Sequence, residues 1–245
     1  MAGRRHDKKG GQVESERKDF ARRDFLKRSR DMAIGLGVAA VIPGIIWLDD
    51  ALAAIPASGG YLLVDTKKCQ GCISCMLACS LVHEGVESQS LSRIQIIQNP
   101  FEAFPEDVAI EQCRQCVDPA CVTACPVDAL KANPKFGNVR MVDRNKCIGC
   151  GACFEECPYT PSRPVVVADE RYNGKLKSRK CDLCANTPYH WDDAGGGPSG
   201  KQACIEVCPV GAIKLTKKIP PQKGDAGYNV NLRGSSWSKL GYPSD

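Results

Sequence analysis

Short apolar runs separated by polar loops recur along residues 60–216. Five of these runs are rich in β-branched and other apolar residues and predict strands: Tyr61–Asp65, Arg93–Ile97, Val139–Val142, Val165–Ala168 and Ala212–Leu215. Three others predict short helical turns: Ala120–Ala124, Ala152–Glu156 and Ala203–Val207. The pattern therefore predicts an α+β fold in which strand, loop and helical turn alternate in small units.

A moderately apolar stretch near the N-terminus, Met32–Leu48, follows a different pattern. Glycines and a proline interrupt it, and its short length disfavours a permanent membrane span. Residues 21–27 (Ala-Arg-Arg-Asp-Phe-Leu-Lys) precede it and Ala51-Leu52-Ala53 follows it. This order resembles a twin-arginine export signal, residues 1–53, cut after Ala53, and it implies that the protein reaches the periplasm already folded. The alternative is a basic arm before a buried helix.

Composition changes the picture because aromatic residues make up only 6% of the chain, whereas cysteines number 16. A chain with few large aromatic side chains has less apolar area to bury, and covalent or metal cross-links commonly compensate. Sixteen cysteines are compatible with disulfides in an exported protein, with structural zinc or with iron–sulfur clusters. The spacing of the cysteines decides among these three.

The cysteines fall into four groups of four, and none is left over. The groups are Cys69, Cys72, Cys75 and Cys79; Cys113, Cys116, Cys121 and Cys125; Cys147, Cys150, Cys153 and Cys157; and Cys181, Cys184, Cys204 and Cys208. Groups one and three have the spacing C-x2-C-x2-C-x3-C, group two has C-x2-C-x4-C-x3-C, and group four has a long insertion between its second and third cysteines. Pro126, Pro158 and Pro209 directly follow the last cysteines of groups two, three and four.

The C-x2-C-x2-C-x3-C-P spacing is the ligand pattern of bacterial ferredoxins. Three cysteines two residues apart wrap a tight loop around a cubane, and Gly71, Gly149 and Gly151 tolerate a backbone close to it. The fourth cysteine faces away toward a neighbouring cluster, and the proline turns the chain off the site. Zinc ribbons need neither a third cysteine at this spacing nor a Cys-Pro end, so the spacing favours iron–sulfur clusters over zinc and over disulfides.

The four quartets, over about residues 60–216, resemble the iron–sulfur subunits that accompany dimethyl sulfoxide reductase-type molybdoenzymes, formate dehydrogenases and some periplasmic hydrogenases. The resemblance implies tandem bacterial-ferredoxin-like modules with interlocked cysteine quartets. It also implies one four-cluster domain at 54–216. Within this domain, residues 60–110 pair with residues 170–216, and residues 111–169 form a central ferredoxin module. A C-terminal extended tail at 217–245 follows.

The resemblance, and not the spacing, also implies which cysteines share a cluster. It implies four [4Fe–4S] clusters, held by Cys69, Cys72, Cys75 and Cys208; by Cys181, Cys184, Cys204 and Cys79; by Cys113, Cys116, Cys121 and Cys157; and by Cys147, Cys150, Cys153 and Cys125.

The sequence contains no recognisable catalytic constellation. The three histidines are scattered, His83 is expected at the surface, and no Gly-rich loop after a strand suggests a nucleotide cofactor. We therefore expect a non-catalytic electron-transfer subunit. The resemblance implies that it joins a catalytic oxidoreductase chain of the molybdenum- or tungsten-pterin type to a quinone-linked membrane subunit or a cytochrome. A free periplasmic polyferredoxin and a zinc-binding adaptor are the alternatives.

The net charge, the insertion in group four and the C-terminal tail lead to three further expectations. Residues 1–53 hold eleven Lys/Arg and eight Asp/Glu, so the formal net charge of +5 falls to +2 after cleavage. Four clusters with their thiolates add about −2 each by ligand counting, which makes a nucleic-acid partner unexpected. The insertion Ala185–Ala203 predicts a surface loop containing Trp191. The aromatic residues Tyr228, Trp237 and Tyr242 predict a C-terminal arm that lies along a partner.

Overall fold

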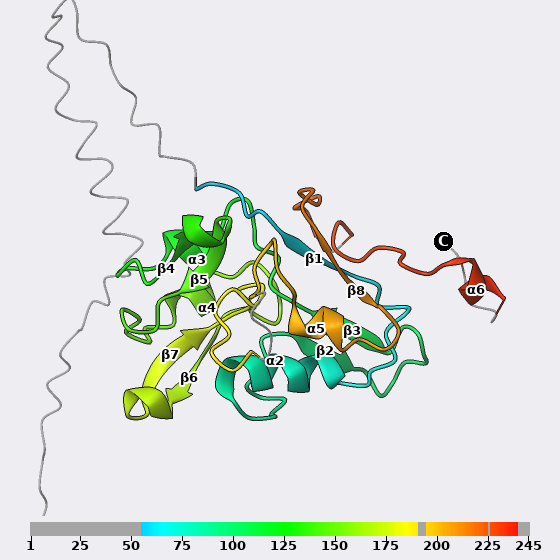
Figure 1. The fold of residues 1–245 in the computed structure, drawn as a ribbon, viewed down its shortest axis with the longest axis horizontal. Helices are drawn as coiled ribbons and strands as arrows, with labels where there is room; N and C mark the ends of the chain where they lie inside the picture. The colour runs from blue at the N-terminus through cyan, green and yellow to red at the C-terminus, as the bar shows by residue number, and fades with distance from the viewer. Residues whose placement is uncertain (1–54, 191–194, 225, 240–245) are drawn as a thin grey trace, which may run out of the picture. The chain divides into compact units, whose positions relative to one another are not determined.

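The computed structural model describes residues 55–190, 195–224 and 226–239 (Figure 1). The predicted export signal, Trp191 and Tyr242 lie outside these residues. Within the described part of the chain, no helix combines the length and the apolar character that crossing a membrane requires.

Four separate two-stranded antiparallel sheets make up the β structure. They are β1 (Tyr61–Val64) with β8 (Ile213–Thr216), β2 (Gln95–Gln98) with β3 (Val108–Glu111), β4 (Leu130–Asn133) with β5 (Val139–Val142), and β6 (Val165–Asp169) with β7 (Lys175–Arg179). The last three pairs are local hairpins, whereas β1 and β8 come from opposite ends of the domain, with Val64 opposite Ile213. The five predicted strands are confirmed to within two residues, and β3, β4 and β7 had not been predicted.

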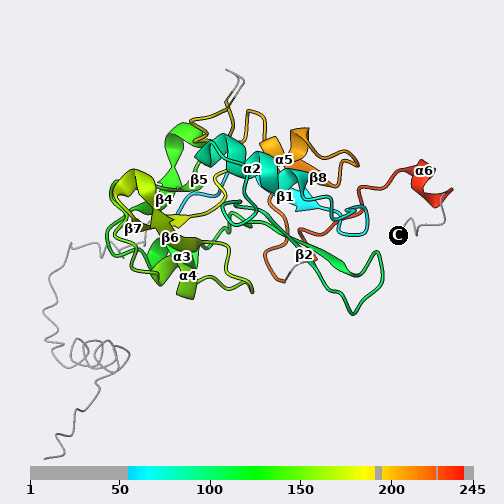
Figure 2. The same cartoon turned by 90° about the horizontal axis from the view of Figure 1, so that it is seen from below.

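The helices are short, with one exception. They are α2 (Ser74–Glu84), α3 (Ala120–Thr123), α4 (Ala152–Glu155), α5 (Ala203–Glu206) and α6 (Ser235–Ser238), with 3₁₀ turns η1 (Pro134–Phe136) and η2 (Glu170–Tyr172). The three predicted helical turns are α3, α4 and α5. In space α2 packs against α5, and α3 packs against α4 (Figure 2). The molecule therefore repeats one arrangement twice, a pair of helices that each carry cysteines.

Helix α2 extends through eleven residues and ends at a glycine. Gly85 takes the left-handed conformation, and its N–H donates to the Leu81 carbonyl oxygen at 2.9 Å. This is a common helix end, because glycine has no Cβ to clash in that conformation. The cap fixes the last turn of α2, which carries the buried residues Val82 and His83.

The main hydrophobic core is built around cysteines. Of its sixteen buried residues six are cysteines, and the rest are mostly aliphatic. Tyr61 and Tyr228 are fully buried, but few other aromatic rings contribute. The thiols thus take the central positions that large apolar side chains occupy in an ordinary domain of this size.

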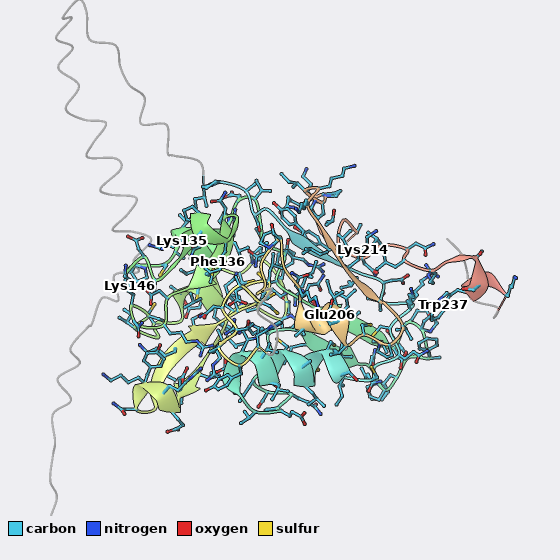
Figure 3. All side chains as sticks on the ribbon, viewed as in Figure 1. Lys135, Phe136, Lys146, Glu206, Lys214 and Trp237 are labelled. Carbon is cyan, nitrogen blue, oxygen red and sulfur yellow. The ribbon has the colours of Figure 1, made fainter. Side chains whose placement is uncertain are left out.

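The segment after β8 returns to the strand β1 of its own chain. The Val64 N–H donates to the Tyr228 carbonyl oxygen at 2.8 Å, and the Val230 N–H donates back to the Val64 carbonyl oxygen at 2.7 Å. The Tyr228 hydroxyl donates to the Arg114 carbonyl oxygen at 2.8 Å. The expectation that the tail aromatics lie along a partner is therefore wrong for Tyr228. Figure 3 shows Trp237 at the far end of this segment, beyond Lys214.

Candidate metal centres

Three small cavities are each lined by four cysteines, three from one loop and one from another group. Cys69, Cys72, Cys75 and Cys208 line the first, which we call site 1; Cys113, Cys116, Cys121 and Cys157 line site 3; and Cys125, Cys147, Cys150 and Cys153 line site 4. The structure thus brings together the cysteines that the resemblance assigned to one cluster in each case. Ligation itself stays a prediction.

The remaining four cysteines, Cys79, Cys181, Cys184 and Cys204, form site 2. All four are buried. Burial raises the pKa of the Cys204 thiol well above its ordinary value, and the neighbouring Cys184, Cys181 and Cys79 raise it further. These thiols therefore lie close enough to interact electrostatically.

A left-handed residue precedes the second cysteine in every group. The residues are Gly71, Gln115, Gly149 and Leu183, with φ of 66°, 48°, 71° and 54°. This conformation turns successive backbone N–H groups toward the same side, which creates a concave anion-binding turn. It is costly for residues with a Cβ, and Gln115 and Leu183 are fully buried, so packing holds them in place.

The glycine of group three cannot be replaced without a clash. A Cβ built at Gly149 would lie 2.4 Å from the carbonyl oxygen of Leu176. The β6–β7 hairpin thus packs directly on the cysteine loop. Gln115 was not predicted as a site residue, and the only signal in the sequence is its place one residue before Cys116, where groups one and three have glycine.

The last cysteine of each group accepts a hydrogen bond from a backbone N–H further along the chain. The donor–acceptor pairs are Arg93 N to Cys79 Sγ (3.4 Å), Leu130 N to Cys125 Sγ (3.4 Å), Arg163 N to Cys157 Sγ (3.3 Å) and Ala212 N to Cys208 Sγ (3.2 Å). Hydrogen bonds of this kind favour the thiolate over the thiol. Their recurrence in all four groups indicates one function for all four.

Burial opposes ionisation of the thiols. Together with the neighbouring Cys69 and Cys72 it raises the pKa of Cys75 to about 12, and burial raises the pKa of Cys121 to about 12. Four thiolates cannot share a buried site without a cation, and a bound metal deprotonates coordinating thiols. Cubane iron supplies this charge, and four cysteine thiolates are its usual ligands. The donor set therefore fits [4Fe–4S] clusters.

Among the described residues, no group of three or more His, Cys, Asp or Glu side chains is placed to hold a single metal ion. In a cubane each thiolate binds a different iron atom. The four-cysteine cavities are therefore the feature that we assign to clusters.

Neighbouring sites share helices. Helix α2 carries Cys75 of site 1 and, one turn later, Cys79 of site 2. Helix α5 carries Cys204 of site 2 and leads into Cys208 of site 1. Helices α3 and α4 link sites 3 and 4 in the same way.

Sites 2 and 3 are joined through a buried side chain. The Gln115 amide in the loop of site 3 donates to the carbonyl oxygen of Cys181 in site 2 at 2.9 Å. The contacts therefore order the sites as 1, 2, 3 and 4. Of the sixteen cysteines only Cys72 and Cys150 are exposed, and they belong to the two end sites.

A buried ion-pair network borders site 2. Its carboxylates are Glu84, Asp169 and Asp182, and its cations are His83, Arg93, Arg144, Arg171 and Arg179. The network joins the C-terminal end of α2 to the β6–β7 hairpin, so it connects the outer and central parts of the domain.

His83 belongs to this network, so the expectation that it lies at the surface is wrong. It is 2% exposed. Its Nε2 lies 3.0 Å from Asp182 Oδ1, and its Nδ1 lies 2.7 Å from the Cys79 carbonyl oxygen. Burial and Arg93 lower the pKa of His83, but Asp182 outweighs them and raises it to about 9. A spacing of four residues from Cys79 within a helix was the signal for this contact.

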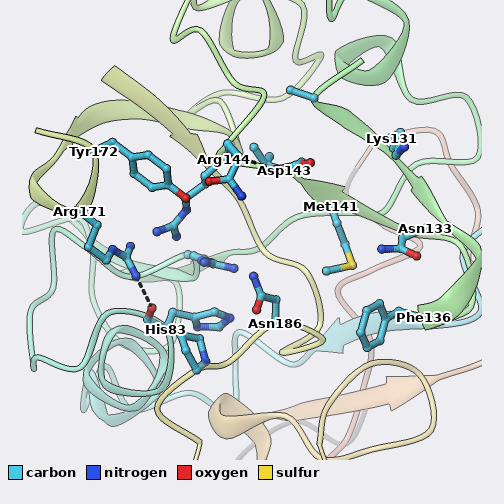
Figure 4. A pocket seen from close by; sticks show the side chains of 15 residues that line it. His83, Lys131, Asn133, Phe136, Met141, Asp143, Arg144, Arg171, Tyr172 and Asn186 are labelled. Carbon is cyan, nitrogen blue, oxygen red and sulfur yellow. Dashed lines mark hydrogen bonds between the residues drawn. The ribbon is translucent and has the colours of Figure 1, made fainter. Parts of the chain in front are cut away.

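A further cavity, of about 400 Å³, has no cysteine in its lining. Figure 4 shows it between His83 of α2 on one side and Phe136 and Met141 of the β4–β5 hairpin on the other. Arg144 and Arg171, which line it, are already paired with Glu84 and Asp169. The cavity therefore marks a packing interface and not a cluster site.

Comparison with known proteins identifies the family. The model of the 4Fe-4S dicluster domain matches residues 106–218. Over 149 residues the chain is 38% identical to the polyferredoxin-like subunit of the aliphatic sulfonate oxidoreductase of Pyrococcus furiosus, and the match covers 60% of this chain and 70% of that one. The chain belongs to the 4Fe-4S dicluster family.

Other known proteins resemble the chain over different lengths. It is 30% identical over 215 residues to the Hydrogenase-2 operon protein HybA of Escherichia coli O157:H7, covering 78% of this chain and 61% of that one. It is 34% identical over 163 residues to the β subunit of the NADH-dependent phenylglyoxylate dehydrogenase of Aromatoleum evansii, of which it spans 31%. Membership in the dicluster family makes the chain an iron–sulfur protein that carries [4Fe–4S] clusters and transfers electrons.

Proposed function

We propose that the chain holds four [4Fe–4S] clusters, one in each of sites 1–4, and conducts electrons between two proteins of an oxidoreductase complex. When bound, each cluster takes up and releases one electron. The observation that carries the proposal is the exchange of last cysteines: each of the three cysteine-lined cavities takes its fourth cysteine from another group. Where one helix supplies a ligand to each of two clusters, the two ligand residues lie about 5–6 Å apart along that helix. This short separation favours fast electron transfer between the clusters.

The protein's own cysteines hold the clusters. The cysteines of site 2 are buried and those of site 3 are buried or partly buried, while Cys72 and Cys150 are exposed at the two end sites. Electrons therefore enter at one of these ends and leave at the other. Charged side chains and backbone N–H groups close to a site set how easily its cluster is reduced.

The partners follow from the resemblance and from the relatives. A catalytic subunit of the molybdenum- or tungsten-pterin type docks at one end, and a quinone-linked membrane subunit or a cytochrome docks at the other. One relative is named as a subunit of a sulfonate oxidoreductase and another as a product of a hydrogenase operon, which supports a catalytic partner. The twin-arginine pattern at residues 21–27 supports a periplasmic location.

The decisive experiment is the iron and acid-labile sulfide content of the full chain purified without oxygen, with an EPR spectrum after dithionite reduction. About sixteen irons and sixteen sulfides per chain, with interacting reduced-cubane signals, are expected for four cubanes. Zinc in place of iron would contradict the proposal. Isolation of the chain alone from its native host, with no large catalytic subunit attached, would instead favour a free polyferredoxin.

The export prediction has its own test. Replacement of Arg22 and Arg23 by lysine should leave the protein in the cytoplasm of its host, still brown and fully loaded with iron. Unchanged recovery from the periplasm would contradict export by the twin-arginine route.

A further inference from the structure

Site 3 differs from sites 1 and 4 in the charge of its lining. Four cationic side chains line its cavity: Arg114, Arg140, Arg163 and Lys180. The cavities of sites 1 and 4 are lined by aliphatic residues and glycines besides their cysteines, with Gln70 and Ser178 as the polar side chains. The cysteine pattern is nearly the same at the three sites, so the difference lies in the surroundings.

Two of these four cations are buried without an acidic partner. Lys180 is 3% exposed, and its Nζ donates to the carbonyl oxygens of Arg140 at 2.8 Å and Cys181 at 3.3 Å. Arg140 is 1% exposed and donates to the carbonyl oxygens of Pro56, Cys116 and Asn138. No carboxylate of the described residues pairs with either side chain, so no ion pair offsets these two positive charges.

The cations near sites 2 and 4 are paired with carboxylates or lie outside the cavity lining. Arg93, next to Cys79 of site 2, is paired with Asp182 and Glu84. At site 4, Lys177 donates to the Cys147 carbonyl oxygen at 2.6 Å, but it does not line the cavity. Of the three cavities lined by cysteines, site 3 therefore has the most positive lining.

Reduction adds one electron to a cluster that is already negative with its four thiolates. Positive charges close to the site favour the added electron, and in a buried site water screens them little. A tenfold change in the reduction equilibrium of a one-electron couple corresponds to about 59 mV. An excess of two buried cations without carboxylate partners is therefore sufficient to give the sites different reduction potentials.

We propose that the site 3 cluster has the highest reduction potential of the four and holds the electron in the singly reduced protein, with Lys180 and Arg140 as the residues that set its potential. The inference rests on the proposed function, since it requires clusters in these sites. Because site 3 lies inside the row and not at an exposed end, the first electron rests away from both docking surfaces. A second electron is then needed before an end site becomes populated.

The test is a redox titration followed by EPR on the full chain, in the wild type and in Lys180→Met. In the wild type, the first signal to appear should be the one that Cys157→Ser alters, because Cys157 is a ligand of site 3. In Lys180→Met the potential of this signal should fall by about 59 mV or more, a tenfold weaker reduction. Site 2, whose Cys181 carbonyl oxygen also accepts from Lys180, should shift less, and sites 1 and 4 should keep their potentials. Lys180→Arg, which preserves the charge, should stay close to the wild type.

Lys177→Met is the matched control, because Lys177 is a comparably buried lysine that also donates to the carbonyl oxygen of a predicted cluster ligand. It should move the potential of site 4 and not that of site 3. Glu111→Gln tests the opposite direction. Glu111 pairs with Arg163, which lines site 3, so removal of its negative charge should raise the potential of site 3.

The outcomes separate the two proposals. Absence of iron in the wild type would overturn the proposed function. Four clusters with another site reduced first, or a site 3 potential that Lys180→Met leaves unchanged, would overturn only the present inference. If Lys180→Met fails to load site 3, the decision rests on Glu111→Gln: a raised site 3 potential supports the inference, and an unchanged one overturns it.

Discussion

Glu84 is the carboxylate on which the buried ion-pair network depends most. Its side chain is 4% exposed and accepts two hydrogen bonds from Arg144, at 2.6 Å to Oε1 and 3.2 Å to Oε2. It also pairs with Arg171, and Arg93 lies 3.6 Å away. Glu84→Gln preserves the shape of the side chain and removes its charge.

The magnitude follows from the burial of the pair. Removing one partner of a buried ion pair commonly costs about 3–5 kcal/mol, because the other charge stays in the interior uncompensated. Asp169 also pairs with Arg144 and Arg171, so we take the lower end of that range, about 3 kcal/mol. Two carboxylates would then face four arginines and a histidine whose pKa is raised to about 9.

The assay is the loss of visible cluster absorbance in guanidinium chloride under anaerobic conditions. Unfolding releases the clusters irreversibly, so a rate and not an equilibrium is measured. The rate of absorbance loss should rise by up to about a hundredfold in Glu84→Gln, since each 1.4 kcal/mol is about tenfold. Glu87→Gln, an exposed site three residues later, is the control and should stay within about 0.5 kcal/mol of the wild type.

The salt dependence provides a second, independent reading. Interactions between exposed charges weaken as salt is added, whereas buried pairs are screened much less. The difference between Glu84→Gln and the wild type should therefore persist when sodium chloride is raised in an assay with urea, which is uncharged, in place of guanidinium chloride. Equal rates for the Glu84→Gln and Glu87→Gln variants would refute the network as a source of stability.

Three further predictions concern the sites and the C-terminal segment. Cys157→Ala should lose the site 3 cluster and keep site 4, measured as a fall of about a quarter in iron content with the site 4 EPR signal intact. Gly149→Ala should lose site 4, because its Cβ meets the Leu176 carbonyl oxygen, whereas Gly174→Ala, with a similar φ and open space, should cost only about 1–2 kcal/mol. Tyr228→Phe should cost about 1 kcal/mol for the lost hydrogen bond to the Arg114 carbonyl oxygen, and Tyr228→Ala about 3–5 kcal/mol, both measured as a faster anaerobic loss of cluster absorbance; equal rates for the two variants would contradict the burial of the ring.

The sequence allowed the strands and helical turns with ordinary patterns to be predicted. Val139–Val142 was predicted with its exact bounds, and Val165–Ala168 lacked one residue of β6. Strand β7 was missed because its buried residues are Lys177, Ser178 and Arg179, while Leu176 is exposed. An alternation of apolar and polar residues cannot find a strand whose inner face serves a cluster site and an ion-pair network.

Helix α2 was missed for a related reason. The cysteines of group one indicate a ligand loop, and this loop passes into the helix at Ser74 without a capping side chain. Apolar residues and cysteines are spread around the whole segment, so no apolar stripe on one face marks the helix. Its existence explains the position of His83, which lies one turn after Cys79 and therefore on the same face of the helix.

The spacing of the cysteines could not predict which of them share a site, because this depends on contacts between segments far apart in the chain. The exchange between groups one and four depends on the pairing of β1 with β8 and on the packing of α2 against α5. These segments lie more than a hundred residues apart in the chain. The local spacing fixes three ligands of a site, and only the fold or a resemblance supplies the fourth.

The same long-range closure explains why the C-terminal segment folds back onto its own chain. Strand β1 is paired with β8 along one edge, and its other edge would expose unpaired backbone groups. Residues 228–230 cover this edge with two backbone hydrogen bonds to Val64, and the Tyr228 ring then packs against the Arg114 guanidinium, 4.6 Å from the ring centroid. Arg114 lines site 3, so the segment that covers the edge strand also contacts a residue of this cavity. The same segment therefore connects the closure of the β1–β8 sheet to the lining of site 3.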